Sequence, residues 1–193
     1  MRQALILLLA SLFIIGFADA TLKENINPGK ATVELDSYEM SFSLPDDVES
    51  YDIQTTPTSN EIFKNSGYDV YIKEADAEGA LLTIMFWIWQ EPQIFPIYEE
   101  VSRTDLGEFG TSVTIPLEID GSEGHVVYNY PEGDPSIDPL KAYGAGFKYY
   151  PRAQSKGEDL EGIYEVSSDT FGAAMEDSRV MPIFQEVMRT IHL

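Results

Sequence analysis

After residue 20, the most apolar stretch of the chain runs from Ala80 to Gln90 and reads ALLTIMFWIWQ. Nearly every position in it is apolar, and β-branched and aromatic residues are frequent. The stretch is too short to cross a bilayer as a helix. It predicts a central strand that is buried on both faces, and such a strand needs strand neighbours along its edges and a covering layer on each face.

Several other segments alternate strictly between apolar and polar positions, which is typical of half-buried strands. They predict strands at residues 38–44, 68–73, 113–119 and 126–130. Two further strands are predicted at 142–150, which is rich in glycine and tyrosine, and at 162–166. Turn residues at 75–79 and 120–124 join neighbouring segments into two antiparallel hairpins. Pro116 lacks a backbone N–H, so its strand is predicted to lie at an edge or to contain a bulge.

Two segments have helical features. Apolar residues recur at helical spacing near the end of the chain, at Val180, Ile183, Phe184, Val187, Met188 and Ile191. A second, short helix is predicted between Pro96 and Gly107, because proline favours the start of a helix and glycine its end. Residues 46–60 are polar and predict a loop with a short strand near 51–54. The expected fold is α+β: a mainly antiparallel β-sheet with the C-terminal amphipathic helix packed on one face.

The first twenty residues have the pattern of a secretory signal peptide. Arg2 precedes an apolar run over 4–17, and Ala18-Asp19-Ala20 is a small-x-small cleavage site. The alternative is an uncleaved membrane anchor. We expect cleavage before Thr21, a polar linker over 21–31 and one α+β domain over 32–193, secreted or located at the cell envelope, with no membrane span after cleavage.

Composition restricts the class of partner. The chain carries 33 acidic and 12 basic residues, a net charge of −21, and no cysteine. A surface this acidic repels phosphate backbones and argues against nucleic-acid binding. Without disulfides, an exported domain must be stabilised by its hydrophobic core.

Three motifs resemble those of the PsbP/Mog1-like α/β/α sandwich proteins. They are SFSLPDD at 41–47, IDGSEGHVVYNY at 119–130 and VMPIFQEVMRTIHL at 180–193. The family's strand ending is matched by Phe42, Leu44 and Pro45, and its final helix by Phe184, Glu186, Val187, Met188, Thr190 and Ile191. The resemblance covers most of 32–193. It implies a PsbP/Mog1-like sandwich that acts as a binding, assembly or accessory module rather than an enzyme, and it transfers no ligand residue.

Candidate ligand-binding residues are aromatic. Trp87 and Trp89 share one face of the predicted central strand, about 6.6 Å apart at the rise of a strand. With Tyr143, Phe147 and Tyr149 they could line a pocket for a sugar or another flat ligand. The competing interpretation is that these rings belong to the core.

Candidate metal ligands lie in the acidic loop between Pro131 and Pro139. Glu132, Asp134 and Asp138 supply hard oxygen ligands that suit Ca²⁺, although the spacing is not that of an EF-hand. In a chain this acidic, a solvated loop explains the same residues. No other cofactor is indicated.

Catalytic motifs are absent from the sequence. The two histidines, His125 and His192, do not suffice for a zinc site, and no Gly-x-Ser-x-Gly motif is present. His125 is predicted to be a surface residue beside a turn. The sequence therefore favours a non-catalytic binding or accessory module with an unknown protein or small-molecule partner outside the cell. The alternative is a secreted hydrolase that uses a pair of carboxylates.

Overall fold

A computed structural model of the chain describes residues 23–26, 29–46, 50–62, 64–90, 98–132, 138–151, 154–155, 158–159, 163–171 and 176–193. Its main element is a nine-stranded sheet with the order β1-β4-β5-β6-β13-β10-β9-β8-β7, in which neighbouring strands are antiparallel. The strands of this sheet are β1 (Lys23–Ile26), β4 (Tyr51–Asn60), β5 (Asn65–Glu74), β6 (Leu82–Trp89), β7 (Ser102–Asp105), β8 (Thr111–Ile119), β9 (Ser122–Tyr130), β10 (Gly144–Tyr149) and β13 (Ile163–Phe171).

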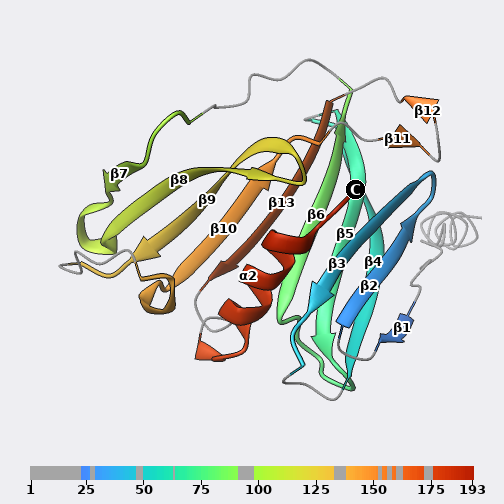
Figure 1. Cartoon of the computed structure of the whole chain (residues 1–193), viewed down its shortest axis with the longest axis horizontal. Coiled ribbons are helices and arrows are strands. Elements are labelled where there is room, and N and C mark those ends of the chain that lie inside the picture. Colours follow the sequence, from blue (N-terminus) through green and yellow to red (C-terminus); the bar gives the residue numbers. More distant parts are fainter. Residues whose placement is uncertain are drawn as a thin grey trace, which may run out of the picture.

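One face of this sheet carries a second layer. Figure 1 shows the α2 helix (Val180–Thr190) and the hairpin of β2 (Gly29–Leu35) and β3 (Tyr38–Leu44) side by side in front of the large sheet. Ser41 and His192 exchange two backbone hydrogen bonds of 2.8 Å, which join the hairpin to the segment after the helix. The smaller elements are β11 (Gln154–Ser155), β12 (Glu158–Asp159) and the 3₁₀ turns η1 (Gly107–Phe109) and η2 (Pro139–Lys141).

The core lies between these two layers. We call the covered side of the large sheet the inner face; on β6 it carries Leu82, Ile84 and Phe86, each at most 2% exposed. The ring of Phe184 on α2 lies 5.6 Å from that of Phe147 on β10, and Tyr38 on β3 packs 4.9 Å from Phe86. Burial of these apolar side chains, one from each layer, holds the helix and the hairpin to the sheet.

Both prolines within the described strands lie just beyond the end of an edge strand of the sheet. β7 pairs with Thr111–Thr114 of β8, so Pro116 comes just beyond it. At the opposite edge, β1 pairs with Tyr51–Gln54 of β4, and Pro57 comes just beyond that. A residue without an N–H is tolerated there because no ladder bond is needed on that side. The strand of Pro116 is therefore not the edge strand that the sequence suggested, but Pro116 lies on the part of β8 that extends beyond β7.

The α+β architecture predicted from the sequence is confirmed, with the final helix packed on one face of an antiparallel sheet. The predicted central strand is β6, but only its even-numbered positions from Leu82 to Phe86 are buried; Met85, Trp87 and Trp89 are half-buried. The helix expected between Pro96 and Gly107 is wrong in its described part, where Ser102–Asp105 form strand β7.

Two segments expected to be irregular contain strands. Residues 23–26 and 29–31 of the proposed linker belong to β1 and β2, and the expected loop over 46–60 contains all of β4. Gly29, at a φ of 123°, stands at the start of β2, where a glycine lets the chain enter the hairpin. The proposed signal peptide, residues 1–20, lies outside the described residues.

Candidate functional site

The side of the large sheet opposite α2 and the β2–β3 hairpin, which we call the outer face, carries polar side chains in its middle. On β6 this face bears Met85 and Trp87, and the residues paired with them on β13 are Ser167 and Glu165. Lys148 on β10 pairs with Ser167 on one side and with His125 of β9 on the other. Glu165, Ser167 and His125 are all buried, which is unusual for polar groups on a face without a covering layer of described residues.

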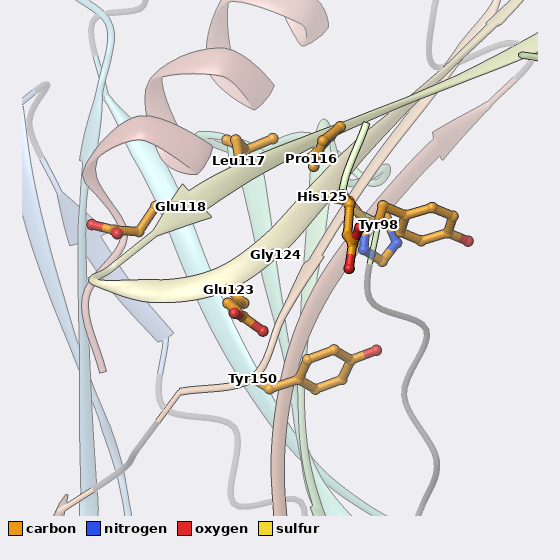
Figure 2. Close-up of a pocket in the computed structure, with 9 residues that line it drawn as sticks. Tyr98, Pro116, Leu117, Glu118, Glu123, Gly124, His125 and Tyr150 are labelled. Carbon is orange, nitrogen blue, oxygen red and sulfur yellow. The ribbon is translucent and has the colours of Figure 1, made fainter. Parts of the chain in front are cut away.

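A pocket of about 560 Å³ lies at the end of the β8–β9 hairpin, next to these polar residues, and we call it the hairpin pocket (Figure 2). Its described lining consists of the rings of Tyr98, His125 and Tyr150, the carboxylates of Glu99, Glu118 and Glu123, and Pro116, Leu117 and Gly124. The pocket lies beyond the end of β7, where the edge of β8 is free of a described strand partner. Its volume falls within the range of small-molecule sites.

His125 is the most deeply buried polar residue among the described lining residues of this pocket. It is 8% exposed, and its ring packs at 4.7 Å against the ring of Tyr98, as Figure 2 shows. Burial, and then the charge of Lys148, lower the pKa of His125, while Glu165 opposes this shift. A neutral imidazole has one N–H donor and one nitrogen acceptor. Within the described part of the chain neither ring nitrogen has a hydrogen-bond partner, so both are available to a bound molecule.

Lys148 and Glu165 form an ion pair beside the pocket. Nζ of Lys148 lies 2.8 Å from Oε1 of Glu165, whose side chain is 7% exposed. Tyr150 follows β10 on the same side of the sheet, and burial, together with the charge of Glu165, raises the pKa of its phenol. The phenol is therefore uncharged at neutral pH, and the Lys148 charge is compensated by a carboxylate.

Two glutamates occupy directly paired backbone positions at the end of the hairpin. Glu118 on β8 and Glu123 on β9 are directly paired positions, both are exposed, and both line the pocket. Like charges at paired positions destabilise an antiparallel ladder. The hairpin pocket thus combines an acidic rim, two tyrosine rings and an unbonded neutral imidazole. This arrangement can bind a ligand. The described lining residues include no serine or threonine that could act as a nucleophile beside His125.

The five aromatic residues proposed from the sequence do not line one pocket. Trp87 and Trp89 are half-buried on the outer face, whereas Phe147 and Tyr149 are core residues of the inner face. The backbone of the sheet lies between the two groups. Tyr143 is partly exposed just before β10, and its hydroxyl donates to the carbonyl oxygen of Phe109 at 2.7 Å. The interpretation as core residues therefore holds for Phe147 and Tyr149.

The proposed calcium ligands are only partly described. Glu132 and Asp138 are exposed, and Oδ1 of Asp138 accepts a hydrogen bond from the amide of Leu140, at the start of η2. Asp134 lies outside the described residues. Within the described residues, no group of three or more acidic, histidine or cysteine side chains is arranged to hold a metal ion. The Ca²⁺ site therefore stays a prediction.

The expectation for His125 is wrong: it is a buried residue within β9 and not a surface residue beside a turn. The alternation along this strand does not determine whether the side chain is buried. His125 alternates with Val126 and Tyr128 in a strand whose other face is apolar, so its own exposure depended on what lies next to that strand. Tyr98 and Lys148, which surround it, are distant in sequence, and only the strand order brings them together.

Comparisons of the chain with protein-family models, with curated proteins and with solved structures found no match. The PsbP/Mog1-like relationship accordingly stays a prediction. No helix in the described part of the chain is long and apolar enough to cross a membrane.

Proposed function

We propose that this protein is an exported, non-catalytic binding or accessory module and that the hairpin pocket holds its ligand. The observation that carries the proposal is His125, whose buried neutral imidazole lines the pocket without a hydrogen-bond partner among the described residues. The ring nitrogens are therefore open to a ligand that enters the pocket. The signal-peptide pattern of residues 1–20 supports a location outside the cytoplasmic membrane.

Binding is tested by titrating the full chain with a panel of neutral, anionic and cationic organic molecules and following backbone amide shifts by NMR. We expect the shifts to cluster at Gly124, His125 and Tyr150. His125→Phe keeps the ring but removes both nitrogens and should weaken binding, whereas His192→Phe, which alters the other histidine, should not. Shifts that cluster instead at the hollow between Pro45 and Pro182 would contradict the assignment.

Export is tested separately. The protein is expressed in an export-competent host, recovered from outside the cytoplasmic membrane and analysed by intact mass. We expect an N-terminus at Thr21. Retention of Met1 on a membrane-bound chain would contradict the signal-peptide assignment and favour an anchor.

A secreted hydrolase is the second candidate, and one observation favours it. Cβ atoms at paired positions such as Glu118 and Glu123 are about 4.5–5.5 Å apart, close enough for a carboxylate pair to act together. Both side chains are exposed, however, and a carboxylic general acid usually works in a desolvated site. Glycoside hydrolysis that is lost in both Glu118→Gln and Glu123→Gln would establish this candidate over the binding module.

A further inference from the structure

The charged side chains of the hairpin pocket all have one sign. Glu99, Glu118 and Glu123 line it, and no lysine or arginine does so among the described lining residues. The chain as a whole carries a charge of −21. A pocket lined by one sign of charge raises the local concentration of ions of the opposite sign. The electrostatics therefore favour a cation.

The nearest positive group does not reverse this preference. Lys148 is paired with Glu165 at 2.8 Å, and it is not among the lining residues. His125 adds no charge, because burial and Lys148 keep it neutral. The net contribution of these three residues to the field in the pocket is therefore small, and the rim carboxylates dominate.

The uncharged groups of the pocket suit a cation that has both N–H groups and an alkyl chain. The faces of aromatic rings attract organic cations, and Tyr98 and Tyr150 supply two such rings. The unbonded acceptor nitrogen of His125 is available to an N–H donor of the ligand. A metal ion could use the imidazole nitrogen, but the described residues contain no group of three or more acidic, histidine or cysteine side chains that could hold one, and a quaternary ammonium lacks the N–H.

We infer that the hairpin pocket binds a protonated alkylamine, with the ammonium near the acidic rim and the imidazole and the alkyl chain against the tyrosine rings. This rests on the proposed function, because it names the ligand class of the same pocket. The ammonium has two possible sources, a free amine or the side chain of a lysine in another protein, and both present the same chemistry to these residues.

The test is an NMR titration of the full chain with n-butylammonium and with its neutral analogue 1-butanol, at matched ionic strength. We expect butylammonium to shift the amides of Gly124 and His125 and to bind at least tenfold more tightly than butanol. A second pair of probes distinguishes the sources: N-acetyl-lysine methylamide and its neutral analogue N-acetyl-norleucine methylamide. Tighter binding of the lysine derivative than of butylammonium assigns the site to a lysine side chain, and the reverse assigns it to a free amine.

The β2–β3 hairpin offers a matched control. Glu34 and Glu39 are also directly paired and exposed, but that hairpin does not contribute to the pocket. The double variants Glu118→Gln/Glu123→Gln and Glu34→Gln/Glu39→Gln remove the same charge from equivalent positions. We expect the first to weaken butylammonium binding at least tenfold and the second less than twofold.

The outcomes separate the two proposals. Equal weakening by both double variants would mean diffuse attraction to an acidic surface and would overturn the inference. Butanol binding at Gly124 and His125 as tightly as butylammonium would also overturn it, while leaving the pocket as a binding site. If no molecule of the broader panel shifts these amides, the proposed function fails as well.

Discussion

The ammonium of Lys148 on β10 lies 2.8 Å from the carboxylate of Glu165 on β13, and the two members of this pair differ sharply in exposure. The Lys148 side chain is 36% exposed and the Glu165 side chain 7%. Lys148 can reach water if its partner is lost, because its long stem is flexible. Glu165 is too deeply buried to reach water in this way. The loss of Lys148 and the loss of Glu165 should therefore change the free energy of unfolding by different amounts.

We therefore expect Lys148→Met to cost more stability than Glu165→Gln. The first change leaves a buried carboxylate without its partner, with an expected loss of about 2–3 kcal/mol; the second leaves a lysine that can be solvated, with a loss of about 1 kcal/mol. Urea unfolding at pH 7 measures both. Arg189→Met is the control, since it breaks the exposed Arg189–Glu186 pair and should change stability little. Equal losses for the first two variants would contradict the burial argument.

Phe184 anchors α2 to the inner face. It is fully buried and contacts the rings of Phe147 and Tyr128. Phe184→Ala should lower the free energy of unfolding by roughly 3–5 kcal/mol, through lost transfer free energy and the cavity left behind. Glu186→Ala, two residues away on the half-exposed side of the helix, should change it by less than about 0.5 kcal/mol. Denaturant melts decide this, and a small effect of Phe184→Ala would mean that the helix is not docked.

The lowered pKa of His125 makes stability depend on pH. The unfolded histidine titrates near 6.5, about its ordinary value, and the folded one at lower pH. The lowered pKa therefore contributes to the free energy of unfolding fully above pH 6.5, and this contribution is lost as the pH falls through the folded pKa. The reason is that the unfolded chain takes up the proton first. The charged groups that face it are Lys148 on β10, which promotes this shift, and Glu165 on β13, which opposes it.

The expected slope is at most about 1.4 kcal/mol per pH unit below pH 6.5. Urea unfolding between pH 7.5 and 5.5 should show this loss in the wild type and a smaller one in His125→Gln. The variant His192→Gln controls for the other, exposed histidine. A slope that His125→Gln leaves unchanged would place the acid sensitivity elsewhere.

The elements that could be predicted from the sequence are those with a strong local period. The alternation over 38–44 and 113–130 gives β3 and the β8–β9 hairpin, and the helical spacing from Val180 to Ile191 gives α2. The strands at 29–31 and 51–60 were not predicted in full, and they contain Gly29 and Pro57, residue types that usually interrupt strands. Pro57 is tolerated beyond the end of β1, and Gly29 at a positive φ. Neither position can be predicted without knowledge of the strand order.

The candidate site depends on register between strands that are distant in sequence. Trp87 and Phe147 are both aromatic strand residues, yet the β6–β13–β10 register puts them on opposite faces. The same register brings Lys148 between His125 and Ser167, which no local pattern indicates. The alternation along a strand shows which of its residues share a face. It does not show which residues of a neighbouring strand lie beside them on that face.

The last prediction concerns the paired glutamates, Glu118 with Glu123 and Glu34 with Glu39. Repulsion at paired positions should make each single change to glutamine stabilising by a few tenths of a kcal/mol. After one glutamate of a pair is gone, removal of the second should bring no further gain from that pair. A double-mutant cycle at each hairpin therefore gives a coupling free energy, which should shrink as salt is added because the residues are exposed.

The two hairpins should respond differently to a cation that binds between the side chains. With n-butylammonium present at matched ionic strength, the coupling between Glu118 and Glu123 should fall or change sign, because a bound ammonium compensates both carboxylates. The coupling between Glu34 and Glu39 should stay the same. Thermal melts of the two cycles with and without the amine measure the difference, and an equal response at both hairpins would show that the amine only screens charge. Retaining a repulsive pair at the mouth of the hairpin pocket is then a cost in stability that cation binding offsets.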